Sequence, residues 1–323
     1  MKAPKRAMKY LKYGLTAAVV LGLAVAAFKY LQGGEVLAAL RAFHGRYMPL
    51  MLLSALAALL LKSWRFQLLI QAVYRNISWK IPWKVFLAGQ PALMLPGGAA
   101  AQVGLMKQAG ADVGRSSAPV VTASLLDQTV LIVGSLLAAL WFEPARTPVL
   151  ISLAVIGLLA LLLWWKPARA PIFRWARNRA ARFKLGHSLD NFAKVMPTLM
   201  APALLAATLG ITLVSHLLKF SILVLAAWGL GVEASYGSLF LAFVVPSLLG
   251  RFTPLPAGIG VVDASMVGFL AVAAQLNTNQ AAALVALFRV VMIFLPVVAG
   301  SVVYFLVWRG AREAADRTSM QPS

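Results

Sequence analysis

The sequence predicts an all-α polytopic membrane protein, and three observations lead to this fold class. Apolar residues make up 61% of the 323 residues, compared with about 45–50% in a typical soluble domain. Charged residues make up only 12%, compared with about 25%. The apolar residues fall in runs of about 20, the length that a helix needs to cross a bilayer. A soluble enzyme, a disordered chain and a basic nucleic-acid-binding protein are therefore excluded.

The rare residue types exclude several kinds of site. The chain contains no cysteine, which excludes disulfides, thiolate nucleophiles and cysteine-ligated metals. Its three histidines and nine scattered carboxylates do not have the spacing of a metal cage. Gly258 and Gly260 have no βαβ context, and the sequence has no Walker loop. We therefore expect no metal and no cofactor.

Six apolar runs are long enough to be full spans. They are Gly14–Leu31, Pro49–Val73, Ala118–Phe142, Val149–Trp165, Leu199–Leu230 and Ala281–Trp308. The first follows a basic stretch, as in a signal peptide, but no small-x-small cleavage site precedes a soluble domain, so we expect it to be retained. Two shorter runs, Trp83–Leu95 and Leu239–Gly260, are interrupted by Pro and Gly residues, which break helices. Since Val261–Leu276 follows as a short helix, about six to eight spans are expected.

The basic residues are distributed unequally between the two sides of the membrane. With the N-terminus in the cytoplasm and the interrupted runs treated as re-entrant, 21 Lys and Arg residues fall on the cytoplasmic side and four on the other. The positive-inside rule then predicts that both termini are cytoplasmic, in the inner membrane of a bacterium. The basic loop 166–195 either only determines topology or lies as an interfacial helix against anionic lipid headgroups.

The two interrupted runs occupy corresponding positions in two halves of the chain, 48–142 and 199–308. The first contains Phe86-Leu87-Ala88, Pro91 and Leu95-Pro96-Gly97-Gly98, and the second contains Phe240-Leu241-Ala242, Pro246 and Leu255-Pro256-Ala257-Gly258-Ile259-Gly260. Because the span before the first run starts outside and the span before the second starts inside, we predict an inverted repeat with two re-entrant hairpins. Paired interruptions of this kind point to a transporter's substrate site. The alternative is a chance similarity between apolar segments.

Seven charged residues lie at membrane depth: Lys62, Arg65, Asp127, Lys219, Arg251, Asp263 and Arg289. Each central charge costs about 2.5–3.5 kcal/mol, so these side chains must pair, snorkel or face water. We predict that Asp127 pairs with Arg289 and that Arg251 pairs with Asp263. The remaining three cations would form an excess of positive charge that suits a phosphate-bearing headgroup. In the alternative interpretation, Lys62 and Arg65 snorkel and the Asp127–Arg289 pair is purely structural.

The stretch Leu255-Pro256-Ala257-Gly258-Ile259-Gly260-Val261-Val262-Asp263, with Arg289 further on, resembles a motif of the lysylphosphatidylglycerol synthase transmembrane family. The resemblance covers about residues 10–308 and implies a flippase-like integral membrane protein. In the first half, Leu95-Pro96-Gly97-Gly98 and the later Asp127 match the family pattern. Asp263 stands where the family has Glu, and Ala99-Ala100-Ala101-Gln102 replaces a Glu and a basic residue, which could mean a different lipid. The aminoacyltransferase domain of the bifunctional lysyl-lipid synthases is absent from this sequence, so only lipid translocation is expected.

We therefore expect a single integral membrane domain over residues 1–323 that transports an anionic lipid and is not an enzyme. The lipid would be a phospholipid or a polyprenyl-phosphate-linked lipid. Two alternatives stay open. The first is the membrane partner of a lipid-modifying transferase, with Asp112, Asp190 and His187 as the interfacial candidates, and the second is a static lipid-binding scaffold. The predicted headgroup site comprises Lys62, Arg65, Asp127, Lys219, Arg251, Asp263 and Arg289, with the hairpin residues Pro96, Gly97, Gly98, Pro256, Gly258 and Gly260.

Overall fold

The computed structural model is helical throughout the elements that it describes. It describes residues 37–38, 40–94, 98–143, 146–147, 150–151, 153–155, 157–158, 186–253, 255 and 258–308. The predicted first span, most of the predicted span Val149–Trp165 and most of the basic loop lie outside these residues. The same is true of the hairpin residues Pro96, Gly97 and Pro256.

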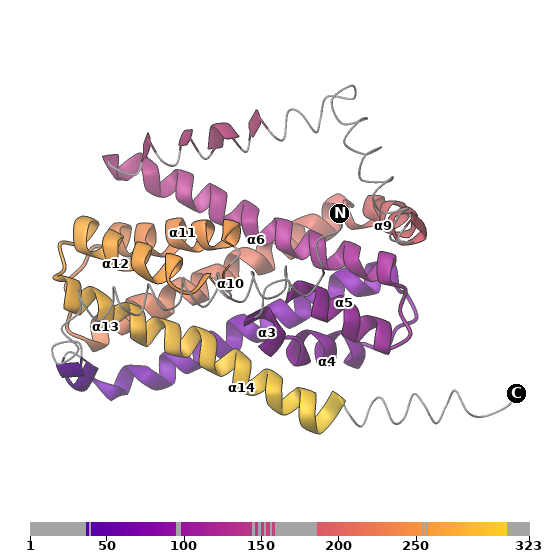
Figure 1. The fold of residues 1–323 in the computed structure, drawn as a ribbon, viewed down its shortest axis with the longest axis horizontal. Helices are drawn as coiled ribbons and strands as arrows, with labels where there is room; N and C mark the ends of the chain where they lie inside the picture. The colour runs from indigo at the N-terminus through magenta and orange to yellow at the C-terminus, as the bar shows by residue number, and fades with distance from the viewer. Residues whose placement is uncertain are drawn as a thin grey trace, which may run out of the picture.

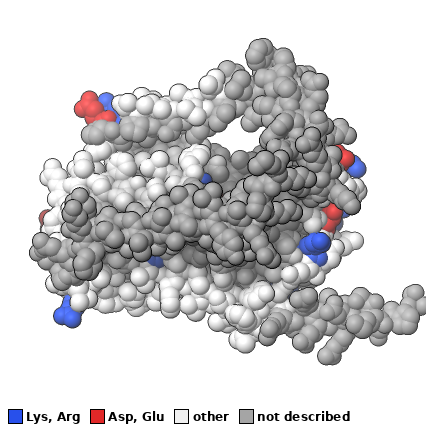
Figure 2. Space-filling view, in the orientation of Figure 1, with Lys and Arg blue, Asp and Glu red and all other residues white. Residues whose placement is uncertain are grey.

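Within the described residues, four helices are long and apolar enough to cross a membrane. They are α3 (Met48–Val73), which follows the short η1 (Gly45–Tyr47), α6 (Val113–Trp141), α10 (Pro202–Gly229) and the continuous run from α13 (Thr278–Arg289) through η4 (Val290–Phe294) and α14 (Leu295–Val302) to η5 (Val303–Trp308). All four run along the long axis of the molecule (Figure 1). On the face in Figure 2, the described charged residues gather toward the two ends of this axis, with only small charged areas between them.

Local features shift the starts of two of the predicted spans. The span predicted from Ala118 begins at Val113, because Asp112 caps α6 by accepting a hydrogen bond from the backbone N–H of Arg115 at 2.8 Å. The span predicted from Leu199 begins at Pro202, since Leu199 is the last residue of α9 (Gly186–Leu199) and Pro202 starts α10. Proline is favoured at the first turn of a helix and disfavours helical geometry in the residue before it.

The interrupted runs fold as two helical hairpins. The first consists of α4 (Lys80–Ala88), η2 (Pro91–Met94) and α5 (Ala99–Gln108), and it packs against α3 and α6 toward one end of the molecule (Figure 1). The second consists of α11 (Tyr236–Phe252) and α12 (Val261–Ala273) and lies toward the opposite end. Whether they are re-entrant and related as an inverted repeat stays a prediction, because both properties are defined relative to a bilayer.

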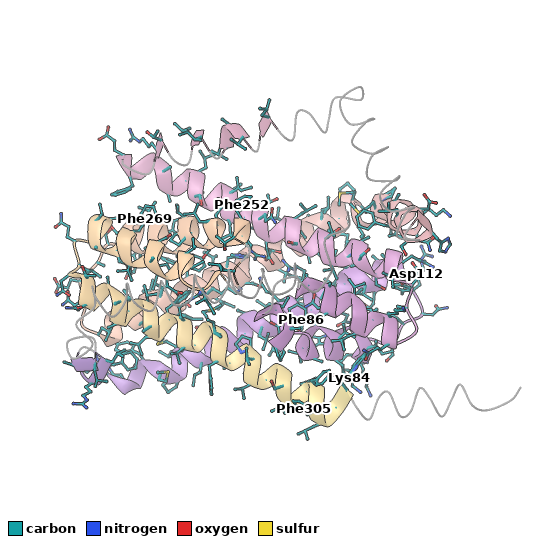
Figure 3. The ribbon with its side chains drawn as sticks, viewed as in Figure 1. Lys84, Phe86, Asp112, Phe252, Phe269 and Phe305 are labelled. Carbon is teal, nitrogen blue, oxygen red and sulfur yellow. The ribbon has the colours of Figure 1, made fainter. Side chains whose placement is uncertain are left out.

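The second hairpin turns between Phe252 and Val261, and the prediction that Pro246 interrupts its first helix is wrong. Pro246 is buried inside α11, where packing against α6 and α12 keeps the helix continuous. At the turn, Gly258 has φ +64° and lies so close to Gly250 that a Cβ atom on it would be 3.2 Å from the Gly250 Cα. In Figure 3, Phe252 of α11 lies nearer the middle of the long axis than Phe269 of α12. The turn therefore points toward the centre of the bundle.

The C-terminal span packs against the turn of the first hairpin through a glycine. A Cβ atom on Gly300 of α14 would lie 2.5 Å from the Leu87 carbonyl oxygen and 2.7 Å from the Pro91 Cδ. The same span widens into π-helix at Val290–Phe294, immediately before Pro296. A proline inside a helix has no N–H to donate and clashes with the carbonyl group four residues earlier, and this accounts for the widening.

We predict that Gly300→Ala destabilises the fold, because the added methyl group overlaps a backbone carbonyl that cannot rotate away. Overpacking of this kind costs about 1–3 kcal/mol. Gly268→Ala is the matched control, since nothing lies within 4 Å of a Cβ atom at that position of α12. Thermal unfolding in detergent should show a lower midpoint for Gly300→Ala alone. Equal midpoints for the two variants would contradict the contact between α14 and the first hairpin.

Candidate functional site

Asp127 is the centre of a charge cluster halfway along the spans. It lies at the middle of the 29-residue α6 and is 5% exposed. Arg65 of α3 binds it with two N–H groups, Nη1 to Oδ1 at 2.9 Å and Nη2 to Oδ2 at 3.2 Å. Lys62 donates to Oδ2 at 3.1 Å. Because this arginine and lysine are three residues apart on α3, they lie on one face of the helix and reach the same carboxylate.

The tip of the second hairpin contributes another cation to the same carboxylate. Arg251, next to the last residue of α11, places its Nη2 atom 3.7 Å from the Asp127 Oδ2. Its side chain is 36% exposed, whereas that of Arg65 is 3% exposed. Asp127 therefore links α6 to α3 and to the hairpin turn, and Arg251 is the most accessible cation that contacts it.

A polar face of α10 completes the cluster. Thr212, His216 and Lys219 follow one another at four and three residues, so they lie on one face of this otherwise apolar helix. The Thr212 hydroxyl accepts a hydrogen bond from the Arg65 Nη1 at 2.7 Å. His216 lies with Nδ1 2.9 Å from the Thr212 carbonyl oxygen and 3.9 Å from the Asp127 Oδ1. Lys219 interacts electrostatically with Asp127. His216 is therefore a buried, hydrogen-bonded residue.

The cluster holds more positive than negative charge. Lys62, Arg65, Lys219 and Arg251 surround Asp127. With the four basic groups protonated and His216 neutral, the net charge is +3. Among the described residues, Asp127 is the only carboxylate within 4.0 Å of any of these cations. In addition, the buried Nε of Arg65 has no hydrogen-bond partner among the described atoms. The cluster therefore has positive charge and a free hydrogen-bond donor with which to bind an anion.

Both predicted ion pairs are wrong, because each partner binds a different group. Asp263 accepts hydrogen bonds from the backbone N–H of Gly260 at 2.8 Å and from the Arg289 Nε at 2.5 Å. The first bond fixes the carboxylate at the start of its own helix, turned toward α13 and away from Arg251. Arg251 instead points toward α6 and meets Asp127. Lys62 and Arg65 are consequently paired with Asp127, and neither snorkels as the alternative interpretation supposed.

The structure thus divides the predicted site residues into two groups. Lys62, Arg65, Asp127, Lys219 and Arg251 form the cluster, and Asp263 with Arg289 forms a separate pair that joins α12 to α13. Gly98, Gly258 and Gly260 lie at the hairpin turns. Thr212 was not among the residues predicted from the sequence, although the polar residues of α10 recur at helical spacing within an apolar run. That spacing was the available signal for this residue.

Of the interfacial candidates for a transferase, Asp112 lies at one end of the bundle (Figure 3), and His187 and Asp190 belong to α9 at the same end (Figure 1). Asp112 is occupied as the cap of α6, and the N–H of Arg115 holds the pKa of this carboxyl below its ordinary value. The side chain of His187 lies 3.0 Å from the Asn191 amide on the same helix. Asp190 of α9 is exposed. These side chains stabilise helix ends or face outward, and among the described residues no His, Asp or Glu group of three or more has the geometry of a metal site.

We predict that Asp127→Asn strongly destabilises the fold. Removing the carboxylate leaves Arg65 buried without its counter-charge, and breaking a buried ion pair in this way costs about 3–5 kcal/mol. The measurement is the free energy of unfolding in mixed micelles. Asp190→Asn is the control, because this exposed carboxylate is far from the spans' midpoint on α9. Equal stability of both variants would show that the cluster does not hold α3 and α6 together.

A second prediction concerns the cap of α6. Because the pKa of Asp112 is lowered in the folded protein, its contribution is present above its ordinary pKa and is lost as the pH falls through the lowered one. Asp112→Ala should reduce stability by about 1 kcal/mol at neutral pH. Asp112→Asn should retain most of the stability, since asparagine also caps helices, but should lack the acid-dependent loss. Unfolding midpoints measured from pH 2 to pH 7 would distinguish the three proteins, and identical pH profiles would contradict the role of the cap.

A comparison with protein families covers almost the whole chain. The family model described as the lysylphosphatidylglycerol synthase TM region matches residues 13–300. The match includes the Asp127 cluster and both hairpins, and it confirms the resemblance that the Pro/Gly motifs indicated. No curated protein matches the chain.

Proposed function

The chain belongs to the lysylphosphatidylglycerol synthase TM family and is a multi-pass membrane protein; from this premise, we propose that it moves an anionic lipid between the two leaflets. The observation that carries the proposal is the surplus of cations around Asp127, halfway along α3, α6 and α10. Charge at this depth is costly, and it is typically found where it serves a substrate or ion pathway. A phosphate group held there would reduce the excess positive charge.

The chemistry of the cluster favours a phosphate-bearing headgroup. Guanidinium groups bind phosphate oxygens with paired N–H donors, and ammonium groups supply further charge without fixed geometry. Arg251 would make the first contact with the headgroup, because its side chain is 36% exposed and its Nη2 atom lies 3.7 Å from the Asp127 Oδ2. Arg65 and Asp127 would mainly hold the framework, since both are buried and bonded to each other.

The hairpins supply the proposed means of movement. In our proposal they are re-entrant, enter the bilayer from opposite faces and belong to inverted halves, 48–142 and 199–308. The headgroup site would then be open to one side of the membrane at a time, because one hairpin would open while the other stays closed. Arg251 sits at the turn of the second hairpin, so movement of that hairpin would move the cation together with its headgroup.

The remaining parts of the proposal follow from the charge distribution and the family. By the positive-inside rule, the distribution of basic residues favours both termini on the cytoplasmic side of a bacterial inner membrane. The substrate class is a phospholipid or a polyprenyl-phosphate-linked lipid, with no cofactor. Since the match comprises the TM region alone, the synthase reaction is not proposed for this chain.

Two other functions remain as alternatives, each with a feature that separates it from transport. A transferase partner would need Asp112, Asp190 and His187, and the geometry gives the first of these a capping role. A static scaffold would bind lipid without exchanging it between leaflets. Exchange that survives replacement of all three interfacial residues would exclude the transferase role.

We predict that Arg251→Gln lowers the rate of exchange of an anionic phospholipid by about tenfold or more. A hydrogen bond to a charged group contributes about 1.5–3 kcal/mol, and 1.4 kcal/mol corresponds to a factor of ten. The measurement is dithionite quenching of fluorescent phosphatidylglycerol in proteoliposomes. Folding should be preserved, because this side chain is partly exposed and is not the main partner of Asp127.

Arg75→Gln is the matched control, because this exposed arginine follows α3 at the end of the bundle. It should exchange lipid at the rate of the unmodified protein. Phosphatidylcholine should be exchanged more slowly than phosphatidylglycerol by the unmodified protein. If Arg251→Gln exchanged phosphatidylglycerol at the unmodified rate, the cluster would not be the headgroup site. If the unmodified protein bound the lipid but exchanged none, the scaffold function would be favoured.

A further inference from the structure

An apolar cavity adjoins the charge cluster on its α6, α10 and α11 side. Its volume is about 250 Å³. The walls come from three helices, represented by Val130 and Gly134 of α6, Leu213 of α10, and Phe240 and Phe243 of α11. The cavity therefore lies between two of the long spans and the first helix of the second hairpin.

The lining of this cavity is almost wholly hydrocarbon. Thr129 and His216 are the only polar side chains in it, and the Thr129 hydroxyl is already bonded to the Leu125 carbonyl at 3.0 Å. A cavity without polar partners does not hold ordered water. In a bilayer, such a space is suited to a hydrocarbon chain.

Gly134 allows α6 and α11 to approach closely at the wall of the cavity. A Cβ atom at this position would lie 3.1 Å from the Val244 Cγ1 and 3.4 Å from the Phe240 Cζ. A larger side chain there would displace Val244 and Phe240, which line the cavity, and would narrow it. The rim is apolar and accessible, because Leu213 and Leu217 are 50% and 51% exposed.

His216 lies between the cavity and the cationic cluster. The imidazole lines the cavity, and its Nδ1 lies 3.9 Å from the Asp127 Oδ1. One ring thus separates a hydrocarbon space from a cluster in which four basic side chains surround one carboxylate. A molecule that fits both parts has an anionic head and an apolar chain attached to it.

We propose that this cavity holds a hydrocarbon chain of the same anionic lipid whose headgroup binds the Asp127 cluster. The proposal rests on the proposed transport function and makes it more specific. The protein would select amphiphiles that carry both a phosphate and a long chain, and a free phosphate would occupy only the cluster. We name the cavity the chain slot.

The chain slot is tested by filling it. Gly134→Leu should slow the exchange of dioleoyl phosphatidic acid by about tenfold or more, because losing even about two buried methylene groups changes affinity by that factor. Binding of soluble dihexanoyl phosphatidic acid should change by less than about twofold. The matched control is Gly210→Leu, since nothing lies within 4 Å of a Cβ atom there and the residue does not line the slot. Rapid exchange of the dioleoyl lipid by a folded Gly134→Leu protein would overturn the proposal.

A second measurement covers the case in which Gly134→Leu does not fold. Phosphatidic acid with a diazirine in its acyl chain should label the slot in the unmodified protein, on peptides containing Leu213 or Phe240. Arg251→Gln should reduce that label, because the chain is held through its headgroup. Absence of label from the slot, or capture of another segment of this chain by a photoreactive residue at position 213, would overturn the proposal.

The failure of transport is distinguishable from the failure of the chain slot. If the unmodified protein did not exchange dioleoyl phosphatidic acid, the proposed transport function would be wrong. Labelling of the slot would still report a bound hydrocarbon chain. Inorganic phosphate should compete with dihexanoyl phosphatidic acid at the cluster but should not remove an acyl-chain label already trapped in the slot. Equal competition by phosphate against both short-chain and long-chain lipids would show that the apolar chain contributes nothing.

Discussion

The ion pair between Asp127 and Arg65 is the interaction on which the rest of the structure depends. It lies at the middle of the spans, with both side chains buried. Lys62 and Arg251 share the same carboxylate, so α3, α6 and the turn of the second hairpin are held by one acidic group. Because a single carboxylate cannot neutralise all of these cations, the same arrangement that fixes the framework also leaves positive charge for a ligand.

Glycine residues determine how closely the two hairpins pack in the bundle. Close contact between Gly250 and Gly258 allows α11 and α12 to meet at a tight turn, and that turn positions Arg251 next to Asp127. At the first hairpin, Gly300 brings the C-terminal span against the Leu87 carbonyl. The small residues therefore determine how far each hairpin extends into the bundle, and hence where charge and apolar space are placed next to each other.

Much of the fold could be predicted from the sequence, because length and hydropathy dictate helices that cross a bilayer. The predicted spans over α3 and α10 and the short helix after the second Pro/Gly turn are found at nearly the expected positions. The errors have local causes. Asp112 extends α6 by capping it, and tertiary packing keeps α11 continuous through Pro246. Neither effect is visible in an average of residue hydropathy.

The sequence by itself determined that the protein is helical, belongs in a membrane, and carries charges at membrane depth that require partners. Only the tertiary structure decided which partners these are. Asp263 is turned toward Arg289 by its bond to the Gly260 N–H, and Arg251 thereby remains for Asp127. The physical reason is that the cost of burying a charged side chain follows from the sequence alone. Which ion pair forms depends on the direction of each side chain, and helix packing and capping fix that direction.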